Sequence, residues 1–530
     1  MKDLSWDFPY TSQRMPVLAD QLVCTAQPLA SSAGLRALQQ GGNAVDAALA
    51  AAITLTVVEP CMNGIGGDAF ALVWDGQRMH GLNASGRSPR AWTRAHFARY
   101  EAMPPRGWDA VTVPGAVSGW RALSQRFGKL PFGDLFESAI RYARDGWIVS
   151  PIVARQWRDQ HAELPGVPGY SPEFAPGGRT PQPGERFANP GQAATLEAIA
   201  RSGGDAFYQG ALARAIADHA RATGGLIDEQ DLAEHRCDWV DPIGVRYGDI
   251  ALQEIGPNGQ GIAAQIALGI LDSLDQPRPA LDSADFFHLQ IEAMKLAFAD
   301  VYTHVADPQA MTVTPAQLLD AAYLRERAAL IDAGQARFPG AGKLHAGGTT
   351  YLTAADSQGM MVSLIQSNFK GFGSGVMVPG TGIALHNRGW GFNLIPGHAN
   401  EVAPRKRPFH TIIPGFLMQD GQPLMSFGVM GGSLQAQGHV QVAVRVGDHR
   451  QNPQAVVDAP RWRIMDDNIR VMVEWNFPPQ AIAGLRARGH EVLVAPRFSD
   501  EFGGAQAIMR MPQGYLGASD HRKDGQPAGC

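Results

Sequence analysis

The hydrophobic pattern near the N-terminus predicts two helices followed by a β-hairpin. In "PLASSAGLRALQQGGNAVDAALAAAITLTVVEP", Leu35 and Leu38 recur at helical spacing between a Ser31–Ser32 start and a Gly41–Gly42 stop. The alanine-rich stretch that follows predicts a second, buried helix, because its small side chains allow close packing. "DAFALVWDGQRMHGLNASG" then predicts two strands that are joined at the Asp75–Gly76 turn.

Helical spacing dominates the middle of the chain and gives way to a strand-rich pattern after Leu352. Apolar residues at steps of three and four predict helices in "GQAATLEAIARSG", "GALARAIADHARATGG" and "DFFHLQIEAMKLAFADVYTHVADP". Later, short apolar runs such as "YLTAAD", "MMVSLIQS", "GIALHN", "HTIIPGFLM" and "PLMSFGVM" are separated by glycine, proline and aspartate turns. A further helix is predicted at "SLQAQGHVQVAVRVG". Together these elements predict an α/β (α+β) protein without internal repeats.

Composition and charge narrow the function classes. The 530 residues include 45% hydrophobic and 18% charged positions, which predicts a globular protein with a large core. The formal net charge is −5 and the densest basic cluster is "PRKRP" at 404–408, so neither nucleic acid nor a membrane is an expected partner. The N-terminus has no apolar core of signal-peptide length and no apolar run of membrane-spanning length occurs later, so the default expectation is a cytoplasmic protein. The cysteines Cys24, Cys61, Cys237 and Cys530 form no CxxC motif, which predicts neither a disulfide framework nor a zinc site.

Candidate chemistry centres on "HAGGTTYLTAADSQGMM", residues 345–361. A Gly-Gly pair before a strand is ordinarily a turn. The alternative is a cleavage site between Gly348 and Thr349, because a threonine that becomes the first residue of a chain can use its own α-amino group to activate its hydroxyl. Gly347 and Gly348 would leave the scissile peptide unhindered. Taken alone, the motif leaves both interpretations open.

Eight collinear segments turn this motif into a family resemblance. They are "PLASSAGLRALQQGGNAVDAA", "VVEPCMNGIGGDAF", "VPGAVSGW", "HLQIEAMKLAFADVYTHVADP", "GGTTYLTAADSQGMMVSL", "GFGSGVMVPGTGIALHNRGWGF", "RPFHTIIP" and "GVMGGSLQAQGHVQ". From about Ala30 to the C-terminus, the sequence resembles the γ-glutamyltransferase family of N-terminal nucleophile hydrolases. The resemblance implies a precursor that cuts itself before Thr349 into a large subunit, residues 1–348, and a small subunit, residues 349–530. It also implies one folded unit, a four-layer αββα sandwich whose central sheets draw strands from both subunits.

The resemblance also implies a catalytic set. Thr349 matches the nucleophile, and Thr350, which is also threonine in the family pattern, joins the substrate-binding candidates. Ser367 lies where the family has a threonine whose hydroxyl steadies the nucleophile, and a serine can make the same hydrogen bond. Gly431 and Gly432 match the pair whose backbone N–H groups form the oxyanion hole, a role that suits glycine because no side chain intrudes. The same "GGS" is also an ordinary helix-start turn.

The expected substrate pocket departs from the family pattern. The arginine that grips an α-carboxylate in γ-glutamyl enzymes aligns with Ser85, and Arg87 lies about 6 to 7 Å further along an extended segment. The aspartate that binds the α-ammonium aligns with Gly391, while Arg388 replaces a nearby glutamine. An arginine at this position would repel an ammonium group and attract a carboxylate.

Three further positions of the expected pocket differ from the family pattern, and several of the altered residues also suit a role without substrate contact. Phe369 replaces an asparagine, and His410 and Thr411 replace a pair of serines. Phe369 also suits a core position, and His410 suits a satisfied, partly buried histidine. Arg388 also suits a surface position after a turn. We keep Arg87, Arg388, His410 and Thr411 as substrate-binding candidates with these alternatives open.

One pair of residues has the spacing of metal ligands. His288 and Glu292 are four residues apart on one predicted helix, but the sequence shows no third ligand. We therefore assign them to packing and hydrogen bonding. We expect neither a metal nor an organic cofactor.

The retained catalytic residues and the altered pocket predict a self-cleaving amidohydrolase whose small amide substrate bears a carboxylate but no α-amino group. The segments "GLNASGR" and "NRGWGF" resemble a branch of the family that hydrolyses oxamate to oxalate and ammonia in purine and allantoin breakdown. A γ-glutamyl hydrolase or transpeptidase acting on glutathione, a cephalosporin-type acylase and an uncleaved binding homologue stay as alternatives. The subunits are expected to form a heterodimer or a pair of heterodimers. Transfer to an amine in place of water stays open.

Overall fold

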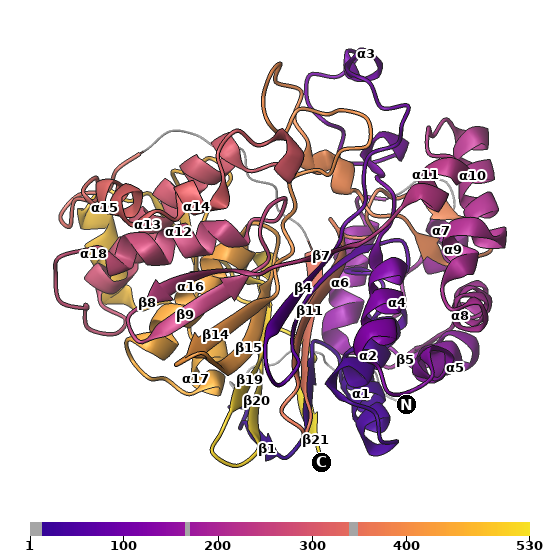
Figure 1. Ribbon diagram of the computed structural model, residues 1–530, viewed down its shortest axis with the longest axis horizontal. Helices are drawn as coiled ribbons and strands as arrows, with labels where there is room; N and C mark the ends of the chain where they lie inside the picture. Colours follow the sequence, from indigo (N-terminus) through magenta and orange to yellow (C-terminus); the bar gives the residue numbers. More distant parts are fainter. Residues whose placement is uncertain (1–12, 165–169, 339–347) are drawn as a thin grey trace.

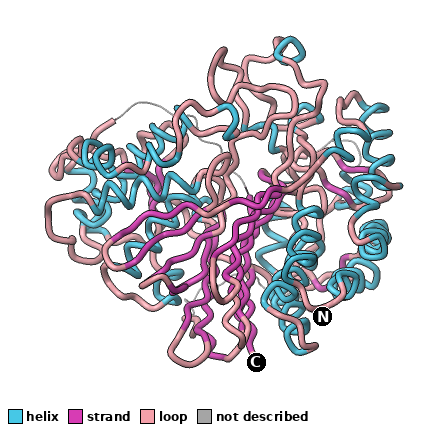
Figure 2. Tube along the Cα trace, viewed as in Figure 1, coloured by secondary structure: helices cyan, strands magenta, loops and turns pink. Residues whose placement is uncertain are grey.

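Two large antiparallel β-sheets lie face to face at the centre of the protein, and helices cover the outer face of each. The computed structural model describes residues 13–164, 170–338 and 348–530. The strands form two adjoining layers with a group of helices on either side (Figures 1 and 2). This arrangement confirms the expected α/β fold class and the αββα order of layers.

Each sheet takes strands from both sides of residue 348. In spatial order, the first sheet contains β1 (Val17–Ala19), β20 (Tyr515–Ser519), β19 (Gly504–Arg510), β15 (Gln422–Met430), β14 (Gly415–Gln419), β9 (Ile250–Glu254) and β8 (Ile243–Tyr247). The second sheet contains β21 (Gln526–Gly529), β2 (Leu22–Thr25), β10 (Gly348–Ala355), β11 (Met361–Phe369), β3 (Asp68–Trp74), β4 (Met79–Ala84) and β7 (Asp238–Val240). Smaller sheets pair β5 (Trp147–Ile148) with β6 (Arg186–Phe187), β12 (Met377–Val378) with β13 (Ile383–Ala384), and β16 (Trp462–Ile464) with β17 (Val471–Val473) and β18 (Val492–Val494).

The helices fall into two groups. Those beside the second sheet are α1 (Pro28–Gln39), α2 (Ala44–Val58), α4 (Ala116–Phe127), α5 (Glu137–Asp145), α6 (Pro151–His161), α7 (Tyr170–Phe174), α8 (Pro190–Ser202), α9 (Asp205–Gln209), α10 (Ala211–Thr223) and α11 (Glu229–Glu234). Those beside the first sheet are α12 (Gly261–Asp272), α13 (Ala284–His304), α14 (Pro315–Leu318), α15 (Ala321–Ala328), α16 (Leu434–Gly447), α17 (Pro453–Asp458) and α18 (Pro479–Ala487). The short helix α3 (Arg94–Phe97) lies apart from both groups (Figure 1). Among the described helices, none combines the length and the apolarity that crossing a bilayer requires.

Three main hydrophobic clusters hold these layers together. One joins α1, α2, α4, α5 and α8 to the second sheet, and another joins α12, α13 and α16 to the first sheet. The third lies between the sheets and includes Phe70, Tyr351, Ile365, Phe416 and Met430. Every residue of α2 is buried, which confirms the predicted buried helix.

Two predicted boundaries are wrong, for local reasons. Helix α1 begins at Pro28, not at the Ser31–Ser32 pair, because the Gln27 side chain accepts a hydrogen bond from Leu29 N and proline is favoured in a first helical turn. In the predicted strand "HTIIPGFLM", pairing starts only at Gly415, directly after the proline. A proline has no N–H to donate to a strand ladder.

The two sheets can approach closely at Gly428 on β15 because a glycine has no side chain. A Cβ added there would lie 2.4 Å from Cδ2 of Tyr351, a fully buried residue of β10. We expect Gly428→Ala to lower the free energy of unfolding by about 1 to 3 kcal/mol, because overpacking forces the ring or the backbone to move. Denaturant unfolding measures this change. Gly133→Ala is the matched control, since its nearest atom would be 3.5 Å away, and equal stability of the two variants would contradict the expectation.

Candidate active site

The candidate nucleophile Thr349 lies where two strands lose their regular register. Between two matched pairs, β11 has one residue more than β10, so both Ser367 and Asn368 face the single residue Thr349. Such β-bulges are common beside active sites, where they redirect side chains. On its other side β11 pairs with β3, and Ser367 lies opposite Asp68. Thr349, Ser367 and Asp68 therefore form a row across three neighbouring strands.

The bulge also contains an unsatisfied polar side chain. Asn368 is fully buried, and neither its side-chain oxygen nor its nitrogen has a hydrogen-bond partner in the described residues. Buried side-chain amides are nearly always paired, so this position suits a polar group that the chain itself does not supply. The sequence pattern did not single out Asn368, because an asparagine in a strand is unremarkable in composition.

The Thr349 hydroxyl is held by a residue that the sequence analysis missed. Thr349 is 1% exposed, and Gln435 donates a hydrogen bond from Nε2 to its Oγ1 over 3.0 Å. Gln435 is itself oriented, because its Oε1 accepts from Ile413 N over 3.0 Å. It lies in the first turn of α16, inside the matched segment "GVMGGSLQAQGHVQ", so the signal was present in the motif.

Gly431 and Gly432 form the turn between β15 and α16. Their φ angles are 122° and 58°, in the region that side chains disfavour, which explains the need for glycine at both positions. Gln260 fixes this turn to the neighbouring loop, since its Nε2 donates to Gly432 O over 2.8 Å and to Thr411 O over 2.6 Å. The turn and Thr349 are thus linked through Gln435, whose N donates to Gly432 O.

Arg388 is buried next to this row and is not a surface arginine. It is 1% exposed and begins a 3-10 turn, Arg388–Gly391. Its Nη1 donates to Thr411 Oγ1 over 2.9 Å and its Nη2 donates to Ser367 Oγ, while its Cζ lies 4.6 Å from the centre of the Phe369 ring. Its Nε has no partner, and in the described residues no carboxylate oxygen lies within ion-pair distance of the guanidinium. Burial lowers the pKa of Arg388 to about 9, against the opposing effect of Asp68.

Asp68 is a buried carboxylate surrounded by N–H donors. Its Oδ1 accepts from Gly115 N over 2.9 Å and from Gly86 N over 3.3 Å. His410 Nε2 lies 3.1 Å from Oδ2, and His386 Nε2 lies 3.5 Å from Oδ1. Burial raises the pKa of Asp68 to about 7, and the Arg388 charge opposes that rise. Asp68 was not a candidate from sequence, because its partners are distant along the chain.

The backbone sets the tautomer of both histidines. Nδ1 of His386 accepts from Arg388 N over 3.0 Å, and Nδ1 of His410 accepts from Ile412 N over 3.3 Å. In the neutral rings the proton is therefore on Nε2, which in His410 donates to Asp68 Oδ2, whereas Nε2 of His386 has no hydrogen-bond partner in the described residues. Burial lowers the pKa of His386 to about 3 and that of His410 well below its ordinary value. Both ring nitrogens of His410 are engaged, as in a satisfied buried histidine, and its contact with substrate stays a prediction.

The positions where the family pattern has an arginine and an aspartate are closed in this structure. Ser85 is fully buried, and its Oγ donates to Asn83 Oδ1 over 2.7 Å. At Gly391 an added Cβ would lie 2.4 Å from Phe409 O. No side chain fits at residue 391 unless the backbone moves, so an acidic group cannot be presented from there.

Arg87 does not join the row around Thr349. Its guanidinium lies 3.3 Å from Asp307 Oδ2 and 3.6 Å from Asp238 Oδ2. It lines a surface pocket of about 390 Å³ together with Ser88, Val113, Asp231, Glu234, His235, Arg236, Asp238, Gln309 and Arg405. Two carboxylates already neutralise Arg87, which makes it a weaker anion site than Arg388.

The side chain of Thr350 is hydrogen-bonded to Glu59 rather than to Arg388. Its fully buried hydroxyl donates to Glu59 Oε2 over 3.1 Å. Burial raises the pKa of Glu59 to about 6, and Lys523 Nζ, 3.8 Å from Oε1, opposes that rise. Thr350 therefore anchors the start of β10 to the end of α2, and a direct role with substrate stays a prediction.

The possible metal pair gains a third ligand only in three dimensions. His288, Glu292 and His490 are buried and offer ligand atoms within 4.8 Å of one another. Lys295 Nζ occupies the same cluster, 2.9 Å from Glu292 Oε1 and 3.5 Å from His490 Nδ1. His288 Nδ1 lies 2.8 Å from His490 Nε2. The ammonium supplies the positive charge that the carboxylate needs, so these residues form a hydrogen-bonded network, in line with the assignment to packing and hydrogen bonding.

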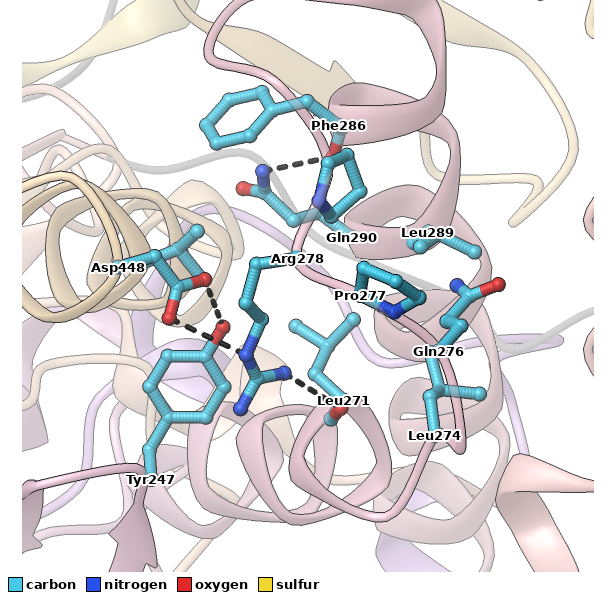
Figure 3. A pocket seen from close by; sticks show the side chains of 12 residues that line it. Tyr247, Leu271, Leu274, Gln276, Pro277, Arg278, Phe286, Leu289, Gln290 and Asp448 are labelled. Carbon is cyan, nitrogen blue, oxygen red and sulfur yellow. Dashed lines mark hydrogen bonds and ion pairs between the residues drawn. The ribbon is translucent and has the colours of Figure 1, made fainter.

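A pocket between α12, α13 and α16 lies apart from this site (Figure 3). Its free volume is only about 20 Å³, because Arg278 fills it. Figure 3 shows the Arg278 guanidinium between Asp448, 3.4 Å away, and the carbonyl of Leu271, 2.9 Å away. Its Cζ also lies 4.5 Å from the centre of the Tyr247 ring. Arg278, Asp448 and Tyr247 are bonded or packed against one another, and we assign this pocket no ligand.

The known proteins that this chain resembles belong to one family but are named for different activities. A family model described as gamma-glutamyltranspeptidase matches residues 30–530. The glutathione hydrolase-like YwrD proenzyme of Bacillus subtilis (strain 168) is 35% identical over 517 residues, covering 96% of this chain and 98% of that protein. The oxamate amidohydrolase proenzyme of Klebsiella pneumoniae subsp. pneumoniae is 37% identical over 518 residues, covering 94% and 97%. The crystal structure of cephalosporin acylase from Bacillus halodurans matches with a TM-score of 0.95 and 45% identity, covering 100% of this chain and 99% of that one.

The neutral, buried state of His410 makes stability depend on pH. An unfolded histidine gains a proton near pH 6.5, whereas the folded ring does not until a much lower pH, so its burial stabilises the protein fully above 6.5 and less as the pH falls. We expect His410→Asn to be less stable than the wild type at pH 7.5. The difference in the free energy of unfolding should shrink by up to about 2 kcal/mol at pH 5. Denaturant titrations at both pH values measure it.

The wild type, unfolded at the same two pH values, is the reference for this experiment. If the gap between His410→Asn and the wild type stays constant from pH 7.5 to pH 5, the His410 ring titrates in the folded protein as it does in the unfolded chain, and the expectation is wrong.

Proposed function

The chain belongs to the gamma-glutamyltranspeptidase family of N-terminal nucleophile hydrolases, and from this membership we propose that it is a self-cleaving amidohydrolase with Thr349 as its nucleophile. Family membership supports the amidohydrolase chemistry. The substrate that we propose is a small amide with a carboxylate next to the scissile bond, with oxamate as the best candidate.

Maturation is the first half of the proposed mechanism. The Thr349 hydroxyl attacks the carbonyl carbon of Gly348, the peptide bond breaks, and the Thr349 nitrogen takes a proton to become an α-amine. Water then hydrolyses the Gly348 ester and frees the new N-terminus. The products are residues 1–348 and 349–530, which stay interleaved because both sheets contain strands of both pieces. Gly347, the other residue of the predicted cleavage motif, lies outside the described residues.

Substrate hydrolysis is the second half. The α-amine of Thr349 takes the hydroxyl proton, directly or through water, and Oγ1 attacks the amide carbon. Backbone N–H groups of Gly431 and Gly432 stabilise the oxyanion, and the Gln435 hydrogen bond holds Oγ1 in position. Ammonia leaves with the returned proton, and water clears the acyl ester. These steps need no metal and no organic cofactor.

The buried, unpaired charge of Arg388 carries the substrate proposal. Its guanidinium contacts the hydroxyl of Ser367, which lies across the bulge from Thr349, and its Nε has no partner. A carboxylate that reaches this guanidinium would supply the missing anion and could bond it through two nitrogens. Only the side chain of Ser367 lies between the Arg388 guanidinium and the position of Thr349 in the strand pairing. The carboxylate and the scissile amide of the substrate must therefore be close together. In oxamate they are directly bonded.

Two alternatives keep support from particular observations. The cephalosporin acylase from Bacillus halodurans shares 45% identity over the whole chain, which favours a larger acyl substrate. Similarity to a glutathione hydrolase-like proenzyme favours a γ-glutamyl group. Against the second alternative, residue 391 offers no space for an acid that would bind an α-ammonium.

We would measure release of ammonia from oxamate, of glutamate from glutathione and of the acyl group from a cephalosporin under the same conditions. Preferential cleavage of glutathione or of the cephalosporin would overturn the proposed substrate.

Self-cleavage is expected to require the Thr349 hydroxyl. On a denaturing gel the purified wild type should give two bands, with about two-thirds and one-third of the 56.8 kDa mass, because the cut lies before Thr349. Thr349→Ala should give a single full-length band, and Thr349→Ser should still cut, since it keeps a hydroxyl. A wild type that stays uncut after prolonged incubation would favour the non-catalytic binding homologue.

Arg388 and Arg87 provide a matched pair for testing carboxylate binding. In the matured enzyme, Arg388→Met should lower kcat/KM for oxamate at least about 30-fold, mainly through KM, because loss of one partner of a buried charge pair costs about 2 kcal/mol or more. Arg87→Met should change it by less than about threefold, since Asp307 and Asp238 already neutralise Arg87. The reverse order of effects would move the carboxylate site to Arg87.

A further inference from the structure

Asp68 is a buried carboxylate for which the proposed mechanism has no role. It lies opposite Ser367, and it influences the pKa of Arg388 although the two side chains form no ion pair in the described residues. The residues around Ser367 therefore include one buried positive and one buried negative group. They are close enough to interact and are held apart by their own hydrogen bonds.

Several titratable or charged groups face Asp68 from the surrounding elements, and among the described residues only Arg388 brings a positive charge that no carboxylate pairs. They are Arg388 and His386 from the segment after β13, Arg407 and His410 from the segment before β14, and Tyr208 from α9, with His235 facing His386. Arg407 is already committed, since it pairs with Asp238 and donates from Nε to Ser85 O over 3.0 Å. Burial and the nearby arginines lower the pKa of His235 to about 3. At neutral pH the histidines are neutral, so Arg388 is the cation that a ligand can use.

A substrate carboxylate at Arg388 would bring a second anion into this enclosure. Two buried carboxylates that share one cation raise each other's pKa, because like charges in a poorly screened interior disfavour the ionised forms. The substrate carboxylate gains direct bonds to the guanidinium and stays ionised. Asp68 lacks such a bond and is the group that becomes protonated.

Resting on the proposed function, we propose that Asp68 takes up one proton from solvent when a substrate carboxylate binds to Arg388, so that the buried site keeps its net charge. No other bond forms or breaks in this step. Asp68 is thus a specificity-determining residue: with Arg388, it makes the site selective for a ligand that adds a single negative charge near the guanidinium.

The hydrogen bonds favour Asp68 over the histidines as the proton acceptor. His386 and His410 each use Nδ1 to accept a backbone N–H and carry their proton on Nε2, so neither neutral ring has a free lone pair. Oδ2 of Asp68 accepts one hydrogen bond, from His410, and a carboxylate oxygen has room for a further proton. The same donors oppose a role for Asp68 in binding a substrate ammonium, because its accessible lone pairs already face N–H groups.

Proton uptake fixes the sign of the pH dependence. Burial raises the pKa of Asp68 to about 7 in the empty site. Above this pH, Asp68 is ionised and must gain a proton as the anion binds, so affinity falls as the pH rises, by at most about tenfold per pH unit. Below it, Asp68 is already protonated and the affinity is level.

Titration calorimetry on the matured wild-type protein tests the proposal directly. The probe is oxalate, the product of the proposed reaction, which does not turn over. One carboxylate of oxalate stands for the substrate carboxylate at Arg388, and any proton uptake caused by its second carboxylate also occurs in Asp68→Asn and is subtracted with that variant. Titrations in two buffers with different ionisation enthalpies give the number of protons taken up per oxalate. We expect a value close to one at pH 8 and a small fraction of one at pH 6, with binding about tenfold weaker at pH 8 than at pH 6.

Two matched variants assign the proton to its acceptor. Asp68→Asn should remove most of the uptake at pH 8 and should make oxalate affinity nearly independent of pH. Asp238→Asn changes the same chemical group in the ion pair with Arg407 and should keep the uptake of the wild type. If Asp68→Asn does not fold, difference infrared spectroscopy of the wild type with isotope-labelled oxalate decides the matter, because protonation of an Asp carboxylate adds a carbonyl band that protonation of an amine does not. Any uptake that persists in Asp68→Asn reports the α-amine of Thr349 or the second carboxylate of oxalate.

The outcomes separate this inference from the proposed function. Oxalate binding with no proton uptake at pH 8 would overturn the role of Asp68 and leave the carboxylate site at Arg388 intact. A matured enzyme that does not bind oxalate would overturn the proposed substrate class and the inference with it. Loss of glutathione cleavage in Asp68→Asn, with unchanged oxalate binding, would instead make Asp68 an ammonium-binding residue.

Discussion

The pairing of β10 with strands on both sides is the constraint on which the rest of the site depends. β10 starts at the candidate cleavage point and lies between β2, from the N-terminal piece, and β11. A strand with two neighbours cannot slide without breaking two hydrogen-bond ladders, so its first residues are held in place. The bulge at its start presents Thr349 from a rigid element, and a cut before Thr349 would leave the remaining ladders intact. The same strand thus positions the candidate nucleophile and, if the chain is cut before Thr349, would hold the two pieces together.

Near this strand, Arg388 and Asp68 are both buried, but in the described residues they form no ion pair with each other. Arg388 is held by two hydroxyls and an aromatic face, and Asp68 by backbone N–H groups and the imidazole of His410. Burying either ion costs several kcal/mol unless hydrogen bonds and opposite charge compensate it. Here the hydrogen bonds are present while the direct ion pair is absent. Such a site is organised in advance for an anion and avoids the reorganisation that water would require.

Short sequence motifs predicted many of the residues of the candidate site. Thr349, Ser367 and the Gly431–Gly432 turn were predicted from short segments, and the structure brings them into one hydrogen-bonded region with Arg388. Gln435 could have been predicted too, because it lies within the same motif as the glycines. Arg87 was placed in the expected pocket by its proximity in sequence to Ser85, but ion pairs with Asp307 and Asp238 hold it elsewhere.

The sequence by itself determined the elements whose causes are local: the buried alanine-rich helix α2, the hairpin of β3 and β4, and the helices α13 and α16. These follow from periodicity, turn residues and caps, which act over a few positions. Only the tertiary structure decided that Asp68 would face His386 and His410, more than 300 residues away, and that Arg388 would be buried without a carboxylate partner. Burial and charge pairing depend on segments that meet only when the two sheets pack, so no local pattern records the pKa values or the ligand preference of the site.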